Sequence, residues 1–400
     1  MRLALFATCL VSLISFGVRG AFGLFMDPVP RALGLDREIY SFAMALQNLC
    51  WGIGQPFAGA LLGRFGGARV LAGGVLLYAL GAALSAFATT PLAIYASAGV
   101  LAGFGLSCAS YITALAVLAT VVPAERRAWA ISVGTAAGSV GQFVLPPLCQ
   151  SFMNVFGWQA TLFLMAGLLL ATLVLLPGLR RTEGTAPAAA LDLPALDVVR
   201  MALSHRSYVL LVLGFFTCGF QLAFIQFHLP AYLTGLGYTT TFAAWSIGLI
   251  GLFNIVGSYI AGPVGSRVGY KYFLAAMYTG RTLLLLVLIA FHGTPLAVLL
   301  VAAGLGVLWL AAAPTTSGLV MTMFGVRYMP VLFGVTFFSH QIGSFAGVWM
   351  GGLVYSQTGS YAISWICCAV LGLVAAALHL PIKEALAPTL HLRAMPQPAG

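Results

Sequence analysis

Apolar stretches of about 20 residues recur along the whole chain, and this pattern most constrains the fold. A helix of that length crosses a hydrocarbon core of roughly 30 Å. A membrane β-barrel would instead show alternating runs of about ten residues. The sequence therefore predicts an all-α membrane protein with twelve transmembrane helices. We place them at residues 3–26, 39–61, 70–89, 92–121, 128–152, 158–178, 207–232, 239–261, 271–292, 295–324, 329–354 and 361–381.

The composition agrees, because only 6% of the residues are charged and 61% are hydrophobic. Polar residues are too few to cover a water-exposed surface, so lipid must surround most of the protein. The seven cysteines fall inside spans and read as packing residues rather than disulfides or metal ligands. We find no phosphate-binding loop and no zinc motif, so we expect neither an enzyme nor a cofactor. The basic residues are dispersed among short loops, which argues against nucleic acid as a partner.

Basic residues in short loops predict the orientation, because they stay on the cytoplasmic side. With the N-terminus inside, 14 of the 18 Lys and Arg residues are cytoplasmic. They are Arg2, Arg64, Arg69, Arg126, Arg127, Arg180, Arg181, Arg200, Arg206, Arg267, Lys271, Arg327, Lys383 and Arg393. We therefore expect a multi-pass protein of the plasma membrane, the inner membrane of a bacterium, with both termini cytoplasmic.

The chain reads as two similar halves. We expect six helices in residues 1–178, a cytoplasmic linker at 179–206 with a short amphipathic helix at 193–204, six helices in 207–384, and a tail without fixed structure at 385–400. Similar segments recur at offsets of 202 or 203 residues: 16–28 and 218–230, 59–66 and 262–269, and 141–143 and 343–345. Three matches in register indicate a duplicated six-helix unit, which is typical of secondary transporters.

The loop at residues 59–69 and its repeat at 262–271 resemble the signature cytoplasmic loop of the major facilitator superfamily. The usual acidic residue is replaced by Gly63 and Ser266. Helix 1, with Arg19, and the stretch 339–344 are most similar to bacterial relatives of the monocarboxylate and oxalate/formate carriers. This resemblance implies the two-bundle fold, a central cavity and transport by alternating access.

Three ionisable residues within spans are candidates for binding a substrate. A charge in mid-membrane costs about 2.5–3.5 kcal/mol, so it needs a partner or a function. Arg19 either braces backbone carbonyls or clamps a carboxylate in bidentate geometry. Arg281 either ties neighbouring carbonyls or contacts substrate. His340 is either a packing residue or a second anion contact that can carry a proton.

Neutral polar residues in the spans add further candidates, each of which could instead join helices. They are Gln47, Asn48, Tyr111, Gln142, Gln221, Gln226, Asn254 and Gln341. From these and the ionisable residues we predict a substrate site of Arg19, Tyr111, Gln142, Gln221, Asn254, Arg281, His340 and Gln341. Several glycines should allow close helix packing, namely Gly103, Gly105, Gly304, Gly306, Gly347, Gly351 and Gly352.

These features favour a monomeric secondary transporter of a small organic anion, a mono- or dicarboxylate, by proton symport or by anion exchange. A drug or metabolite exporter of the same fold is the alternative if Arg19 faces protein and the cavity is aromatic. A membrane sensor that binds without transporting is the alternative from another class.

Overall fold

The computed structural model describes residues 2–181 and 193–387, and the regular elements within these ranges are helices. The N-terminal part contains α1 (Arg2–Ala21), η1 (Phe22–Phe25), α2 (Pro28–Leu33), α3 (Arg37–Phe65), α4 (Gly67–Ser85), α5 (Pro91–Ile94), the π-helical η2 (Tyr95–Leu101), α6 (Ala102–Ala109), α7 (Tyr111–Val121), η3 (Ala124–Arg126), α8 (Arg127–Ala171) and η4 (Thr172–Arg181). The C-terminal part contains α9 (Ala195–Leu203), α10 (Arg206–Gly235), α11 (Thr240–Val268), α12 (Tyr270–Phe291), α13 (Pro295–Val307), α14 (Ala312–Thr358) and α15 (Ala362–His379).

The number of membrane crossings agrees with the prediction. Among the described residues, nine helical segments are long and apolar enough to span a membrane. Two of them, Trp129–Pro177 and Pro295–Thr358, turn at the positive-φ glycines Gly157 and Gly325, so each contains two crossings. These turns, together with the 29-residue α3, bring the number to twelve. The short helix predicted at 193–204 is confirmed as α9, whereas linker residues 182–192 and tail residues 388–400 lie outside the described part.

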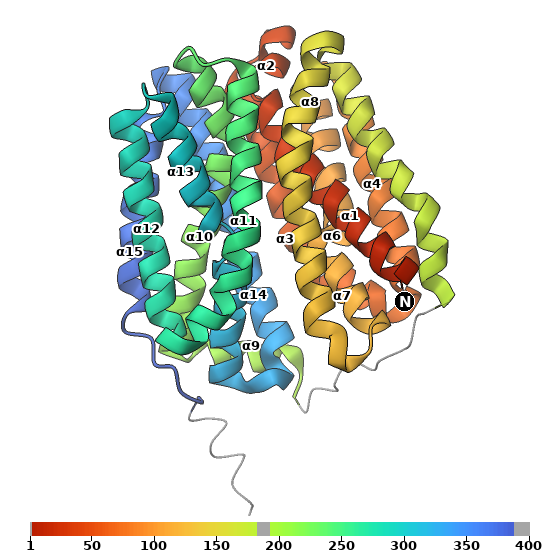
Figure 1. The fold of residues 1–400 in the computed structure, drawn as a ribbon, viewed down its shortest axis with the longest axis vertical. Coiled ribbons are helices and arrows are strands. Elements are labelled where there is room, and N and C mark those ends of the chain that lie inside the picture. Colours follow the sequence, from red (N-terminus) through yellow and green to blue (C-terminus); the bar gives the residue numbers. More distant parts are fainter. Residues whose placement is uncertain (1, 182–192, 388–400) are drawn as a thin grey trace, which may run out of the picture.

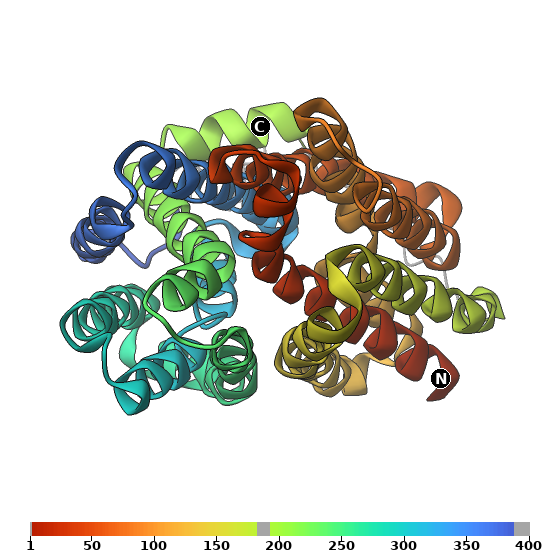
Figure 2. The same ribbon diagram turned by 90° about the horizontal axis from the view of Figure 1, so that it is seen from above.

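The helices gather into two bundles, one from α1 to η4 and the other from α10 to α15 (Figure 1). Seen from above, the bundles stand side by side, and α1 crosses its own bundle obliquely to reach the boundary (Figure 2). The bundles lie closer together at the end that carries α2 than at the end where α7 and α9 lie (Figure 1). We call these ends the α2 end and the α9 end.

The internal repeat is visible in how helices cross within each bundle. A Cβ built on Gly141 of α8 would lie 1.8 Å from the Leu13 carbonyl oxygen of α1. The repeat-related Gly343 of α14 would meet the Phe216 carbonyl oxygen of α10 at 2.0 Å. No real Cβ fits at such distances, so both crossings require glycine. All seven glycines predicted to allow close packing are confirmed, each with a neighbouring atom within 3.0 Å of a built Cβ.

Two crossings that the sequence predicts as continuous helices are broken, and they occupy corresponding places in the two halves. The fourth crossing has a π-helical segment and then an extended residue, Ser110, whose Oγ accepts a hydrogen bond from the Thr113 N–H at 3.3 Å. The tenth crossing is interrupted between Val307 and Ala312. Broken helices in both repeats are a feature of transporter sites, where polar backbone is exposed inside the protein.

The close crossings predict a large effect of one added methyl group. We expect Gly141→Ala and Gly343→Ala each to destabilise the protein by about 1–3 kcal/mol, because backbone must move to admit the Cβ. The matched control is Gly63→Ala, also in a helix, where a Cβ would meet nothing within 4 Å. Thermal unfolding of the three purified variants in detergent measures this. Equal melting temperatures for Gly141→Ala and Gly63→Ala would contradict the packing described here.

Candidate functional site

Arg19 lies near the end of α1, where that helix reaches the boundary between the bundles, and its side chain is only 8% exposed. Its Nη2 donates a hydrogen bond to Asn48 Oδ1 of α3 at 2.7 Å. Trp51 and Phe227 place their rings 5.0 and 5.8 Å from the guanidinium carbon. The Nε–H is buried without a partner. Among the residues that the structure describes, no carboxylate lies within 4.0 Å of this cation.

Gln341 and His340 extend this cluster into the second bundle. Gln341 Nε2 on α14 donates to the Asn48 carbonyl oxygen at 3.2 Å. His340 Nδ1 lies 3.0 Å from Gln341 Oε1, and its ring stacks on Phe337 at 5.9 Å. The buried Gln341 thus reaches the α3 segment that holds Arg19, with the half-buried His340 beside it.

A pair of glutamines closes the boundary on the other side of Arg19. Gln226 Nε2 on α10 donates to the Gly20 carbonyl oxygen at 2.8 Å, and Gln142 Nε2 on α8 donates to Gln226 Oε1 at 2.9 Å. Gln142 Oε1 is buried without a partner. Gly23 follows one turn later and packs directly against the Gln226 backbone. Gln142 therefore lies against Gly20, the residue next to Arg19, and Gln226 bonds to both across the bundle boundary.

Tyr111 belongs to the same region, at the break in the fourth crossing. It is the first residue of α7, and its ring lies 5.0 Å from that of Phe16. Phe16 stands about one helical turn before Arg19 on α1. The structure thus brings together Arg19, Tyr111, Gln142, His340 and Gln341.

Three predicted site residues, Arg281, Asn254 and Gln221, lie apart from this cluster. Arg281 is buried in the second bundle and donates to the Leu308 and Trp309 carbonyl oxygens at the break in the tenth crossing. Asn254 accepts from the Leu310 N–H at the same break and donates to Ser139 Oγ of the first bundle at 3.0 Å.

Gln221 stands 202 positions after Arg19, yet it is turned away from the first bundle. Its Nε2 donates to the Cys368 carbonyl oxygen of α15 at 2.9 Å. The repeat therefore conserves the backbone at this position but not the direction of the polar group.

The α2 end is closed by contacts between the bundles. Arg37, ion-paired with Asp27, donates to the Tyr361 hydroxyl at 3.4 Å. The Glu38 N–H donates to Ser356 Oγ at 3.2 Å. Burial lowers the pKa of Arg37, but Tyr361 and Asp27 outweigh it and hold that pKa above its usual value. The hydrogen bonds that join the bundles thus run from the α2 end to the level of Arg19.

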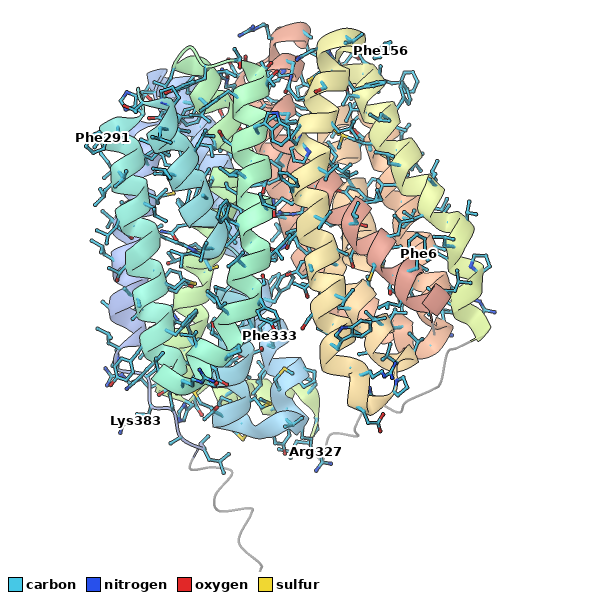
Figure 3. The ribbon with its side chains drawn as sticks, in the orientation of Figure 1. Phe6, Phe156, Phe291, Arg327, Phe333 and Lys383 are labelled. Carbon is cyan, nitrogen blue, oxygen red and sulfur yellow. The ribbon has the colours of Figure 1, made fainter. Side chains whose placement is uncertain are left out.

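At the α9 end the basic helix termini gather, as the predicted loops require. Figure 3 shows Arg327 and Lys383 at this end of the second bundle. Phe333, further along α14, lies between Arg327 and the middle of the molecule (Figure 3).

The sequence analysis did not predict three residues that contact the two buried arginines. Trp51 and Phe227 cover the guanidinium of Arg19, and Cys218 lies 3.3 Å from Arg281 Nη1. All three are apolar residue types in spans full of such residues. The only available signal is spacing, since Trp51 lies one helical turn after Asn48.

Comparisons with known proteins give one consistent result. The model of the Major Facilitator Superfamily matches residues 8–348. An uncharacterised transporter of this type, YcxA of Bacillus subtilis, is 25% identical over 92% of this chain and 91% of its own length. Monocarboxylate transporter 13 of Rattus norvegicus is 27% identical over 89% of this chain and 82% of its own.

Solved structures agree on the fold. The D-xylose-proton symporter superposes with a TM-score of 0.72 at 17% identity, covering 94% of this chain and 97% of the symporter. The nucleoside transporter NupG gives 0.76 at 14% identity, covering 95% and 99%. At these identities the likeness concerns architecture alone.

The contacts of Gln226 predict that it holds the α2 end closed. Gln226→Leu removes two hydrogen bonds between the bundles, each worth about 0.5–1.5 kcal/mol, and leaves buried polar groups unpaired. A Glu38→Cys/Ser356→Cys pair would report closure through its disulfide yield, measured by peptide mass spectrometry. We expect Gln226→Leu to lower that yield several-fold at short reaction times.

The control is Thr161→Val, another buried polar residue, whose hydroxyl donates within α8 to the Gly157 carbonyl oxygen. It should leave the yield unchanged. Unaltered cross-linking in Gln226→Leu would show that these amides do not hold the two bundles together.

Proposed function

The chain belongs to the major facilitator superfamily, and we propose that it is the carrier of a small organic anion, a mono- or dicarboxylate. The superfamily makes it a secondary transporter, a multi-pass membrane protein that moves a small molecule rather than an enzyme. Alternating access then requires a site at the bundle boundary that each side can reach in turn.

The observation that carries the proposal is the buried Arg19. A guanidinium has five N–H donors, always stays charged and fits a carboxylate in bidentate geometry. Among the described polar side chains, this guanidinium has one hydrogen-bond partner, the neutral Asn48, and its Nε–H is unpartnered. Burying an uncompensated cation costs several kcal/mol. An incoming carboxylate supplies the missing charge.

Relatives support the same substrate class. Two of the similar proteins, from Rattus norvegicus and Homo sapiens, are named monocarboxylate transporters 13 and 11, at 27% and 24% identity. These names describe those proteins. Together with Arg19 they favour a carboxylate over a sugar or a nucleoside for this chain.

The basic α9 end supports an orientation. On this side, Arg64, Arg126 and Arg267 stand at the ends of α3, η3 and α11. Arg200 lies in the last turn of α9, and Arg327 follows the turn at Gly325 in α14. Because basic loops remain cytoplasmic, the α9 end faces the cytoplasm and the closed α2 end faces outward. We place the protein, as a monomer, in the plasma membrane, the inner membrane of a bacterium.

One observation favours the alternative, an exporter of drugs or metabolites. Trp51 and Phe227 both lie against the guanidinium of Arg19 through cation–π contacts. Such contacts are worth about 0.5–2 kcal/mol, so they offset part of the burial cost without an anion. Binding measurements on Arg19 variants decide between the two functions.

We expect Arg19→Gln to weaken carboxylate binding by about 10- to 150-fold, since a hydrogen bond to a charged group is worth about 1.5–3 kcal/mol. Arg19→Lys should restore only part of the affinity, because an ammonium offers a point charge instead of a planar fork. Isothermal titration with pyruvate and with succinate measures both variants.

The matched control for this experiment is Arg206→Gln, at an exposed arginine on the first turn of α10. It should bind like the parent. If Arg19→Gln also binds carboxylates as tightly as the parent, Arg19 is not the anion site and the exporter function gains support.

The orientation makes a separate prediction. Reporter fusions that fluoresce only in the cytoplasm should be active at both Met1 and Gly400, because twelve crossings place both termini on the basic side. Activity at neither terminus, in protein that reaches the membrane, would reverse the orientation.

A further inference from the structure

A cavity of about 250 Å³ lies between the bundles at the α2 end. Its lining comes from η1, α2 and α8 of the first bundle and from α10 and α11 of the second. Gly23 of η1 lines it and packs against the Gln226 backbone, whereas Arg19 is not among the lining residues. The cavity is therefore separate from the Arg19 site, and its wall is complete only while the bundles are joined at this end.

Two amide side chains of α8 leave hydrogen-bonding groups available to an occupant of this cavity. The buried Gln150 donates through Nε2 to Asn154 Oδ1 at 2.7 Å, and Thr240 Oγ1 of α11 donates to the same oxygen at 3.4 Å. Among the described residues, neither Gln150 Oε1 nor Asn154 Nδ2 has a hydrogen-bond partner. One acceptor and one NH₂ donor thus remain, next to a hydrogen bond that joins the two bundles.

The α2 wall of the cavity carries an excess of positive charge. Asp27 Oδ2 accepts from Arg31 Nη2 at 2.9 Å, and Asp27 Oδ1 accepts from Arg37. One carboxylate thus faces two guanidinium groups. The Arg31 side chain is 79% exposed, and its bond to Asp27 uses one of the five N–H donors of a guanidinium. An anion that enters the cavity can therefore bind Arg31 without displacing Asp27.

Size, charge and donor pattern together indicate the chemical class of the occupant. The cavity is smaller than the roughly 300–1,000 Å³ of sites for drug-sized molecules, so a small metabolite fits it. A carboxylate would pair with Arg31 and accept from the Asn154 NH₂. Gln150 Oε1 only accepts, so it requires a donor on the occupant, such as a hydroxyl. The combination fits a small hydroxycarboxylate.

We propose that this cavity is a second binding site, for a small hydroxycarboxylate, and that its occupant holds the bundles together at the α2 end. Arg31, Gln150 and Asn154 come from the first bundle, whereas Thr234 and Thr240 line the cavity from the second. A ligand that contacts both bundles binds the joined arrangement and not the separated one. It therefore shifts the population toward the joined arrangement.

Occupancy of this site would regulate transport from the α2 side, a consequence that rests on the proposed function. Alternating access requires the bundles to separate at this end before a solute can reach Arg19. A hydroxycarboxylate that accumulates on this side fills the cavity and slows that separation. Uptake from the α2 side should therefore rise with concentration, pass through a maximum and then fall.

The disulfide between Glu38→Cys and Ser356→Cys reports closure of the α2 end and tests the site directly. The probes, at equal ionic strength, are malate, succinate, which lacks the hydroxyl, and malamide, which is neutral. Malate should increase the disulfide yield at short reaction times, succinate should increase it less, and malamide should leave it unchanged. Equal effects of malate and malamide would overturn the anion assignment, and equal effects of malate and succinate would overturn the role of Gln150.

Arg31→Gln, in the same cysteine background, removes the charge on which the site depends. We expect the malate concentration that gives half of the effect to rise about tenfold, the value of one charge-assisted hydrogen bond. Each variant is compared with and without malate, so a change in its starting yield cancels. The matched control is Arg267→Gln, at an exposed arginine of α11 at the α9 end, which should respond like the parent. An unchanged malate response in Arg31→Gln would overturn the site.

Arg19→Gln separates this inference from the proposed function. Because the two sites are distinct, malate should still increase the disulfide yield in this variant, although binding at Arg19 is weakened. A response that disappears in Arg19→Gln and persists in Arg31→Gln would place the effect at Arg19 and refute the second site. Malate binding that is lost in Arg31→Gln but fully retained in Arg19→Gln would support the second site and refute the carboxylate function proposed for Arg19.

Discussion

The buried guanidinium of Arg19 is the constraint on which the centre of this protein depends. It lies where the two bundles meet, with one neutral oxygen acceptor and two aromatic rings around it. The neighbouring Gly20 carbonyl and the Asn48 carbonyl accept the amide bonds that join the bundles. The same short segments therefore hold the charge and close the boundary. A ligand that binds Arg19 would therefore also affect the hydrogen bonds that hold the bundles together, which is the linkage that alternating access requires.

The two halves share their helix packing, whereas the polar residues at corresponding positions differ. Gly141 and Gly343 make the same close crossing in each half, and a helix is broken at the fourth and at the tenth crossing. Backbone exposed at the tenth break is satisfied by Arg281 and Asn254. The position of Arg19, in contrast, is taken by Gln221, which bonds inside its own bundle. The charged member of the candidate site thus comes from the first half.

Most of the architecture could be predicted from the sequence, because membrane spans need long apolar segments and duplication leaves matching positions. The broken helices could not, since Ser110 and the stretch after Val307 lie in apolar sequence and depend on partners far along the chain. For the site, polar residues in spans predicted Arg19, Gln142 and His340 as candidates, and the structure places them at the bundle boundary. Sequence could not reveal that Gln221 turns away, or that Cys218 contacts Arg281, because those facts depend on side-chain direction.

Ligand-dependent stability is the most direct test of whether the molecule recognises a carboxylate. A ligand that binds only the folded state raises the melting temperature, by an amount set by its concentration relative to Kd. Purified protein should be heated with carboxylates, amino acids, sugars and cationic drugs at matched concentrations. We expect small carboxylates to raise the melting temperature, and sugars and cationic drugs to leave it unchanged. Stabilisation by cationic drugs, with none by any carboxylate, would contradict it.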